Sequence, residues 1–278
     1  MGRVTARRQV LRVRDGVAGH RPDTLVVEEP LEIRVMGEPL AVTMRTPGDD
    51  FPLAAGFLLS EGVVTSAKQI QSIAYCAGAV EDGSNTYNVL DVRLAEGVPV
   101  PGPELRRHVY TSSSCGLCGK ASLEAVHTTA HWELPPPADS YRLSPALLSS
   151  LPDRLRERQR VFERTGGLHA AALFTPEGRL VDLREDVGRH NAVDKLLGQA
   201  LLDGQLPLRD SVLLVSGRAS FELAQKAVMA SVPTLAAVSA PSSLAVDLAE
   251  EAGLTLVAFL RGTSMNVYAG AERVALDG

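Results

Sequence analysis

Short apolar runs alternate with longer amphipathic segments throughout the second half of the chain. A hairpin pattern comes first, with arms at residues 170–174 and 179–183. The spacing of apolar residues then alternates between the two-residue period of a strand and the 3.6-residue period of a helix. It predicts helices at residues 191–202, 219–230 and 242–251, and strands at residues 211–216, 234–238, 254–259 and 266–269. Because strands that alternate with helices at this spacing form covered sheets, this half predicts a largely parallel α/β sheet with helices on both faces.

The first half has a less regular pattern that is typical of a mixed α+β unit. Asp49 and Asp50 precede the apolar run of residues 51–61, which predicts a short capped helix with Pro52 in its first turn. Alternation predicts strands at residues 31–35, 40–44, 70–76, 87–94 and 106–111, the first two joined around Gly37-Glu38-Pro39.

Three consecutive prolines within residues 134–139 mark the best linker, because proline neither continues a helix nor fits a central strand. A further helix is predicted to begin at Ser144-Pro145. The sequence therefore predicts two units, a mixed α+β subdomain at residues 1–134 and an α/β domain at residues 135–278.

Composition limits the partners and the compartment. The 278 residues are 45% hydrophobic and carry a net charge of −5, which argues against nucleic acid and anionic membranes as partners. The apolar runs are too short to span a bilayer, and the N-terminus lacks the apolar core of a signal peptide. Three cysteines make a poor disulfide framework, so a reducing cytoplasm is predicted.

Cys115 and Cys118 form a C-x-x-C motif between the predicted strand at residues 106–111 and a helix-like segment at residues 120–126. The N-terminus of a helix favours a thiolate over a thiol. A thiolate beside a second thiol can carry sulfur, exchange disulfides or supply half of a metal site, and the motif alone leaves these open. Cys76 follows an apolar strand and is interpreted as a small buried side chain.

Polar turns are expected at the carboxyl edge of the predicted sheet, where open α/β sheets bind ligands. Ser216, Gly217 and Arg218 occupy one strand-to-helix turn, where glycine permits close approach and arginine offers a fork for phosphate. Arg261 and Gly262 follow the last regular strand. Each turn alone is equally compatible with a tight connection, but several on one edge favour a phosphate-rich ligand.

A dense run of ionisable groups from Asp186 to Lys195 forms a further turn, where the hairpin meets a helix. In one interpretation, Asp186 caps the helix and Lys195 pairs with a carboxylate. In the other, the helix start is a ligand pocket that includes His190 and Asn191, because the run holds more unlike polar groups than one cap requires. His169 is either a hydrogen-bonded structural residue or a member of the same pocket.

Together these segments resemble the formate dehydrogenase accessory sulfurtransferase family (FdhD/NarQ). The run at residues 185–195 is highly specific, whereas a C-x-x-C alone would not identify a family. The matching segments, which follow one another over roughly residues 25–275, are residues 54–62, 114–119, 166–169, 185–195, 216–220, 259–262 and 266–268.

The resemblance implies a cytoplasmic sulfurtransferase that accepts sulfur from a cysteine desulfurase as a cysteine persulfide. It would pass the sulfur to the bis-pterin guanine dinucleotide cofactor of formate dehydrogenase, which contains molybdenum or tungsten. Cys115 would bear the persulfide, and Cys118 would be a second carrier, a resolving thiol or a support that keeps Cys115 ionised. The residues expected to bind the cofactor are Phe259, Leu260, Arg261, Gly262, Thr263 and Ser264, together with Ser216, Gly217, Arg218, His190 and Asn191 from the polar turns.

The resemblance also implies a homodimer that serves the catalytic subunit of formate dehydrogenase. For residues 135–278 it implies a cytidine-deaminase-like three-layer α/β/α fold. No metal ligated by the protein is expected. The individual roles of His169, His190 and Asp194 stay open, as does the surface that meets the desulfurase.

Three other functions compete with sulfur transfer. A thiol–disulfide oxidoreductase shares the C-G-x-C pattern, but here the motif lies outside a βαβ unit, and such a protein has no use for the polar turns. A zinc deaminase needs H-x-E and P-C-x-x-C, which residues 169–171, 190–192 and 216–220 lack. A non-catalytic escort would bind the cofactor without transferring sulfur. Sulfur transfer is the function that uses both the thiols and the polar turns.

Overall fold

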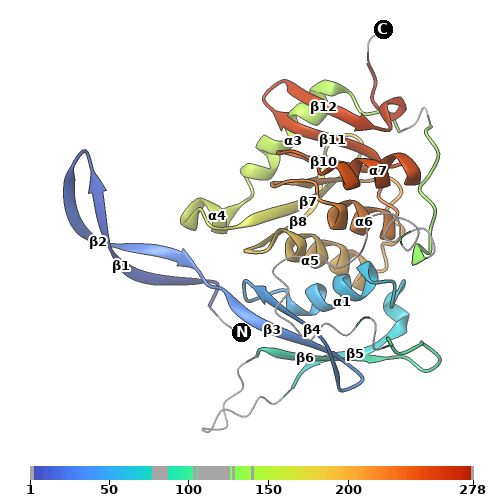
Figure 1. Cartoon of the computed structure of the whole chain (residues 1–278), viewed down its shortest axis with the longest axis horizontal. Helices are drawn as coiled ribbons and strands as arrows, with labels where there is room; N and C mark the ends of the chain where they lie inside the picture. The colour runs from blue at the N-terminus through green and yellow to red at the C-terminus, as the bar shows by residue number, and fades with distance from the viewer. Residues whose placement is uncertain are drawn as a thin grey trace.

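The computed structural model describes residues 3–76, 87–102, 105, 126, 129–138 and 141–276. In this part of the chain, the strands form three sheets of six, four and two strands. Figure 1 shows the six-stranded and four-stranded sheets in the body of the molecule, with helices between them, and the two-stranded sheet projecting to one side. Among the described helices, none combines the length and the hydrophobicity needed to cross a bilayer.

The six-stranded sheet has the order β12-β11-β10-β9-β7-β8. Its central strands β9, β10 and β11 are parallel, whereas the pairings β7–β8, β7–β9 and β11–β12 are antiparallel. The prediction of a largely parallel sheet is therefore correct only for the three central strands. The predicted hairpin, β7–β8, and the β11–β12 pair at the other edge are antiparallel, because short connections join only antiparallel strands. The strands are β7 (His169–Phe174), β8 (Leu180–Asp186), β9 (Val212–Val215), β10 (Thr234–Ala237), β11 (Thr255–Arg261) and β12 (Ser264–Ala269).

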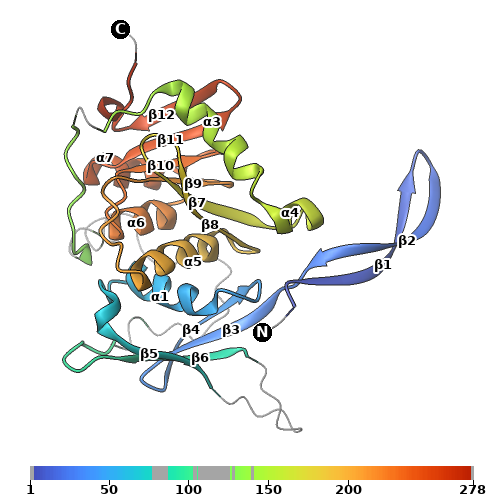
Figure 2. The ribbon, with the colours of Figure 1, turned by 180° about the vertical axis from the view of Figure 1, so that it is seen from behind.

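Helices cover both faces of this sheet, as the sequence predicted. Leu148, Leu151 and Leu155 of α3 pack with apolar residues of β7, β9, β10 and β11 in one buried cluster. Figures 1 and 2 show α5, α6 and α7 on the opposite side of the sheet, where their apolar residues join a second, larger cluster. The helices are α3 (Pro145–Arg156), α4 (Arg160–Thr165), α5 (Arg189–Leu202), α6 (Phe221–Met229) and α7 (Ser243–Ala252).

The four-stranded sheet and helix α1 (Asp50–Ser60) are built from the first half of the chain. The strand order is β4-β3-β6-β5, with bounds β3 (Glu29–Val35), β4 (Glu38–Arg45), β5 (Ile70–Tyr75) and β6 (Val89–Leu94). Helix α1 lies between this sheet and α5, and its buried leucines belong to the same cluster as those of α5. One continuous core therefore joins the two halves of the chain.

Two glycines allow α1 and α5 to touch through their backbones. A Cβ added at Gly56 would overlap the carbonyl group of Asp194, and one added at Gly198 would overlap the carbonyl oxygen of Pro52. This close crossing sets the distance between the four-stranded sheet and the six-stranded sheet. It also brings the loop after β4 to the start of α5.

Two local predictions in the first half are corrected by the structure. Helix α1 is confirmed, but Asp49 has a φ of 53° and makes no side-chain capping bond. Its carboxylate instead accepts a hydrogen bond from Arg184 at 2.9 Å. The β3–β4 hairpin turns at Met36 and Gly37 and not at Gly37-Glu38-Pro39. Both residues have positive φ, as a type I′ hairpin turn requires, and proline cannot adopt such a value.

The third sheet is a hairpin that the sequence analysis missed. Strands β1 (Thr5–Arg14) and β2 (Val17–Val26) pair along their whole length and join at Asp15 and Gly16, which both have positive φ. Figures 1 and 2 both show this hairpin extending away from the body of the molecule. We call residues 5–26 the arm. Two short 3-10 helices, η1 (Ala67–Gln69) and η3 (Ala271–Arg273), complete the described elements.

Candidate functional site

Strand register brings the predicted polar turns to one edge of the six-stranded sheet. Ala237 of β10 lies beside Val215 of β9, and Val215 lies beside Ala171 of β7. His169, at the start of β7, pairs with Asp186 at the end of β8. The ends of β8, β9, β10 and β11, the start of β7 and the N-termini of α5, α6 and α7 therefore share this edge. We call its side chains the rim: His169, Arg189, His190, Gly217, Arg218, Ser220, Glu222, Phe259 and Arg261.

Gly217 lies against two ionisable side chains. A Cβ at this position would be 3.5 Å from Nδ1 of His169 and 3.9 Å from Cδ of Arg189. Burial lowers the pKa of the half-buried His169 imidazole, and the nearby charges of Arg189 and His190 lower it further. Nε of Arg189 is buried and has no hydrogen-bond partner within the described residues. A neutral imidazole beside a guanidinium with an unused donor suits an anionic ligand.

His190 and Glu222 connect the starts of α5 and α6. Nε2 of His190 lies 3.2 Å from Oγ of Ser220 and 3.7 Å from Oε2 of Glu222. The interaction with His190 is the main cause that lowers the pKa of Glu222 to about 2, so this carboxyl is ionised at neutral pH. His190 therefore lies at the rim, as predicted, and its imidazole contacts groups that orient it.

The end of β11 presents a strained, open turn. Phe259 has a φ of 52°, an uncommon value for a bulky residue, and 38% of its surface is exposed. Its N–H donates to the carbonyl oxygen of Ser239 at 3.2 Å, and Nε of Arg261 donates to the carbonyl oxygen of Val238 at 3.1 Å. Arg261, Gly262, Thr263 and Ser264 are exposed. Leu260 is fully buried in the core under α3, so only its backbone is available to a ligand.

In the turn after β9, the first residue has a structural role and the next two face the edge of the sheet. Oγ of Ser216 accepts a hydrogen bond from the N–H of Ala170 at 2.9 Å, which ties β7 to β9. Gly217 exposes its backbone beside His169, and the side chain of Arg218 is exposed to solvent. The structure thus brings Gly217, Arg218, Phe259 and Arg261 to one edge.

Several residues of the 185–195 run lie instead in a buried polar contact between the two halves of the chain. Nζ of Lys195 is 2.7 Å from Oδ2 of Asp186 and donates to the carbonyl oxygen of Thr46 at 2.8 Å. The amide of Asn191 donates to the carbonyl oxygen of Met44 at 2.7 Å and accepts from Thr43 at 3.1 Å. The pairing of Lys195 with a carboxylate is therefore confirmed.

The same polar contact continues on the next turn of α5. Oδ1 of Asp194 accepts hydrogen bonds from Nζ of Lys226 at 2.7 Å and from Oγ of Ser60 at 2.9 Å. The helix itself begins after Gly188, whose N–H donates to Asp186 at 2.8 Å. We call Asp186, Asn191, Asp194, Lys195 and Lys226 the polar junction, because they hold α1 and the end of β4 against α5 and α6.

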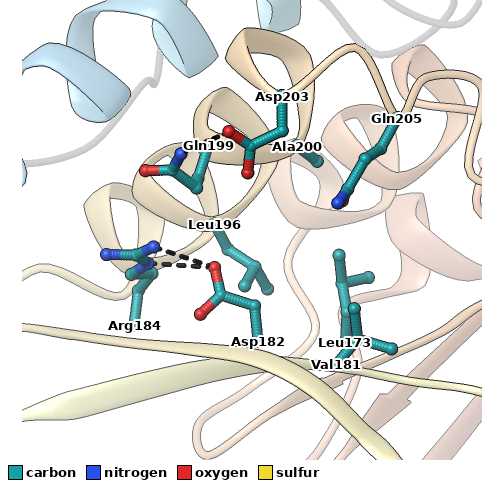
Figure 3. A pocket seen from close by; sticks show the side chains of 9 residues that line it. All are labelled: Leu173, Val181, Asp182, Arg184, Leu196, Gln199, Ala200, Asp203 and Gln205. Carbon is teal, nitrogen blue, oxygen red and sulfur yellow. Dashed lines mark hydrogen bonds and ion pairs between the residues drawn. The ribbon is translucent and has the colours of Figure 1, made fainter.

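A separate hollow lies between β8 and the C-terminal half of α5. It has a volume of 360 Å³, and Figure 3 shows Arg184 bonded to Asp182, and Gln199 bonded to Asp203, at its wall. Its lining contains no residue that the sequence predicted for the site. The lining residues are Leu173, Val181, Asp182, Arg184, Leu196, Gln199, Ala200, Asp203 and Gln205.

Cys115 and Cys118 lie outside the described residues, as do the predicted strand at residues 106–111 and most of the helix-like segment after the motif. Cys76 is partly exposed, which corrects the expectation of a buried side chain. Within the part of the chain that the structure describes, no group of three or more His, Cys, Asp or Glu side chains is arranged to hold a metal ion.

Sequence reasoning missed two contributors to the rim. Arg189 lies inside the run that was singled out, but the sequence did not show that its guanidinium would adjoin Gly217. Glu222 lies two residues beyond Ser220, and no local pattern distinguished it from an ordinary acidic residue in the first turn of a helix. Only the arrangement of α5 beside α6 brings it to His190.

Comparisons with known proteins agree over nearly the whole chain. A model of the FdhD/NarQ family matches residues 26–275. The chain is 73% identical over 278 residues to the sulfur carrier protein FdhD of Streptomyces avermitilis, which covers 99% of this chain and 98% of the relative. It is 61% identical over 271 residues to the sulfur carrier protein FdhD of Mycolicibacterium paratuberculosis, covering 98% of this chain and 99% of the relative.

A solved structure supports the same relationship. The crystal structure of a candidate formate dehydrogenase accessory protein from Desulfotalea psychrophila matches with a TM-score of 0.76 at 27% identity. The match covers 98% of this chain and 100% of that chain. On the combined evidence of sequence and fold, this chain belongs to the FdhD/NarQ family.

Proposed function

We propose that this protein is a sulfur carrier required for formate dehydrogenase activity. It takes sulfur from a cysteine desulfurase as a persulfide on Cys115 and delivers it to the molybdenum or tungsten bis-pterin guanine dinucleotide cofactor. The observation that carries the proposal is the 73% identity, over almost the full length of both chains, to a protein named as a sulfur carrier. The name of the Desulfotalea relative supports formate dehydrogenase as the client.

Loading of Cys115 by the desulfurase is a thiol–persulfide exchange and needs no external oxidant or reductant. The Cys115 thiolate attacks the outer sulfur of the persulfide on the desulfurase, a new S–S bond forms, and the desulfurase cysteine leaves as a thiolate. In delivery, the cofactor supplies the electron pair for a new bond to the outer sulfur, the S–S bond breaks, and Cys115 keeps that bonding pair as a thiolate. Cys118 either carries sulfur itself, keeps Cys115 ionised or resolves the persulfide. In the resolving role it attacks the inner sulfur, sulfide leaves, and a cellular thiol reductant must then reduce the Cys115–Cys118 disulfide.

The rim supports binding of the guanine dinucleotide cofactor as a substrate. Gly217 lets a phosphate approach the backbone beside His169 and Arg189, because no side chain of its own projects there, and Arg218 and Arg261 add exposed guanidinium groups. The N-termini of α5, α6 and α7 direct their free N–H groups toward the same edge. Phe259 offers an exposed ring that can stack on a base.

The remaining proposed cofactor residues differ in what they present. Gly262, Thr263 and Ser264 are exposed on the β11–β12 turn, whereas Leu260 has only its backbone to offer. His190 offers an imidazole at the rim, where its Nε2 lies beside Oγ of Ser220. Ser216 and Asn191 hold the surrounding strands and α5 in place.

We also infer that residues 135–278 form a cytidine-deaminase-like α/β/α domain, with residues 1–134 as a mixed subdomain, and that the protein acts as a homodimer. The six-stranded sheet, with α3 on one face and α5, α6 and α7 on the other, supports this interpretation of the second half. The proposed setting is the cytoplasm, with a desulfurase as donor and the formate dehydrogenase catalytic subunit as recipient.

Intact-mass spectrometry after incubation with a cysteine desulfurase and cysteine tests the transfer. The wild-type chain should gain one sulfur atom, and peptide mapping should place it on Cys115. Cys115→Ala should gain none there, whereas Cys76→Ala removes a partly buried thiol outside the motif and should load normally. Loading that persists unchanged in Cys115→Ala would contradict the proposal.

Two measurements separate sulfur transfer from its alternatives. An escort without transfer would still activate formate dehydrogenase when Cys115 is alanine, whereas a sulfur carrier would bind GDP normally and activate nothing. A thiol–disulfide oxidoreductase would reduce insulin with turnover, and we expect none.

A further inference from the structure

The arm is an isolated two-stranded hairpin that projects from the body of the molecule. Its two strands pair only with each other, and it meets the body at its base, where Val26 lies against Gly167 and β2 contacts α4. Figures 1 and 2 show the rest of the hairpin clear of the sheets and helices. A two-stranded hairpin in water is marginally stable on its own, because it buries almost no apolar surface.

The register gives the arm two different faces. Side chains alternate along a strand, and directly paired residues share a face. Leu11 pairs with His20 and Val13 with Ala18, so these four residues share one face near the tip, where the side chains of Leu11, Val13 and Ala18 lie beside the imidazole of His20. Their large side chains are exposed, 58% for Leu11 and 63% for Val13.

The opposite face is basic. Four arginines lie there, and none of them forms an ion pair within the described part of the chain. The charged residues of this face are Arg8, Arg12, Arg14 and Arg21, together with Asp23 opposite Arg8, and its apolar residues include Val10, Val17 and Leu25.

The charge of the arm is opposite to that of the remaining chain. The arm contains five arginines and two aspartates, which give it a net charge of +3. Because the whole chain has a net charge of −5, the residues outside the arm have a net charge of −8. The body of a second copy therefore has a net charge opposite to that of the arm, and long-range attraction between them favours the encounter. In addition, the family match begins at residue 26, so the arm lies outside the segment by which the family is recognised.

We propose that the arm is a dimer clasp, whose Leu11 and Val13 face packs on the body of a second copy, while the arginines on the opposite face contribute long-range attraction between the two copies. A two-fold arrangement makes the exchange reciprocal, so each copy gives one arm and receives one. Leu11 and Val13 are the anchors that lose water on contact, and the arginines guide the approach. The clasp extends the proposed homodimer by naming the element that forms it, and sulfur loading of Cys115 does not depend on it.

Sedimentation velocity of the full chain tests the clasp. The double variant Leu11→Asp/Val13→Asp should raise the dimer dissociation constant by about 100-fold or more, since two central apolar anchors become charged. The matched control Val17→Asp/Leu25→Asp adds the same charges on the other face of the same hairpin, at side chains that are 74% and 42% exposed. The control should raise the constant far less, and added salt should weaken the wild-type dimer.

A photo-cross-linking residue at position 13 gives a second, independent measurement. In a mixture of heavy- and light-isotope chains, it should join position 13 of one copy to the body of the other. A wild-type chain that stays monomeric, a dimer equally sensitive to both double variants, or cross-links confined to one chain would each overturn the clasp. Normal loading of Cys115 in Leu11→Asp/Val13→Asp keeps such a failure separate from the sulfur-carrier proposal.

Discussion

The polar junction and the rim use the same kinds of side chain in opposite ways. In the junction, Lys195 and Asp186 are 1% and 0% exposed, and each charge meets an opposite charge within hydrogen-bond distance. At the rim, Arg218 and Arg261 are exposed, and Arg189 keeps a buried Nε without a partner among the described residues. A paired buried charge spares the fold the cost of an unpaired one, whereas the exposed guanidinium groups of Arg218 and Arg261 are available to a ligand.

Position along one helix decides which role a residue has. His190 and Asn191 are neighbours in the first turn of α5, yet the imidazole contacts Ser220 at the rim while the amide bonds to Met44 and Thr43. Successive residues on a helix point in directions that differ by about a quarter turn. One short, highly specific run therefore serves both the fold and the proposed ligand site.

The largest expected effect comes from breaking the junction. Lys195→Met leaves the Asp186 carboxylate buried without its cation and should lower the free energy of unfolding by about 3–5 kcal/mol. Arg218→Met at the rim removes an exposed charge and should change it by less than about 0.5 kcal/mol. Chemical denaturation measures both, and equal losses would erase the distinction between the two regions.

Two glycine substitutions, one at the α1–α5 contact and one at the rim, should have smaller effects and separate stability from ligand binding. Gly198→Ala forces a Cβ into the carbonyl oxygen of Pro52 and should destabilise the fold by about 1–3 kcal/mol. Gly217→Ala places its Cβ at an ordinary contact distance from His169, so stability should stay nearly constant while GDP binding weakens. Calorimetric titration with GDP and denaturation of both variants check this, and unchanged GDP affinity in Gly217→Ala would remove Gly217 from the site.

The smallest effect is a titration at the rim. The pKa of His169 lies below 6.5 in the folded protein, so the unfolded chain takes up a proton first, and this residue makes stability fall as pH drops from 6.5 toward its folded pKa. A bound phosphate favours the imidazolium form, so GDP should raise the pKa of His169. Side-chain NMR follows the shift, with His20 on the arm as a control that should not move.

Much of the secondary structure could be predicted from local pattern. Strands β9, β10 and β11 and helices α5, α6 and α7 fall within a few residues of their predicted bounds, because their apolar periodicity is uninterrupted. The arm escaped notice although Asp15-Gly16 is a strong two-residue hairpin signal. Its strands carry arginines where a core-forming strand carries apolar residues, so alternation alone did not mark them.

The site was predictable as a set of positions, but the function of each side chain was not. The Gly217–Arg218 and Phe259–Arg261 turns reach the same edge because strand ends meet there in any sheet of this connectivity. Burial of Leu260 and the engagement of Asn191 by β4 depend on elements that pack from elsewhere in the chain. Arg189 and Glu222 join the rim for the same reason.

The amino-acid sequence by itself determined the order of helices and strands from α5 to β12, the turns rich in glycine and arginine, and the family resemblance, because these depend on patterns among neighbouring residues. The tertiary structure alone decided that Asp186 and Lys195 are a buried pair, that α1 and α5 touch through Gly56 and Gly198, and that the arm stands free of the body. These outcomes depend on contacts between distant segments, and a charge or a glycine acquires its role only from the groups that fold against it.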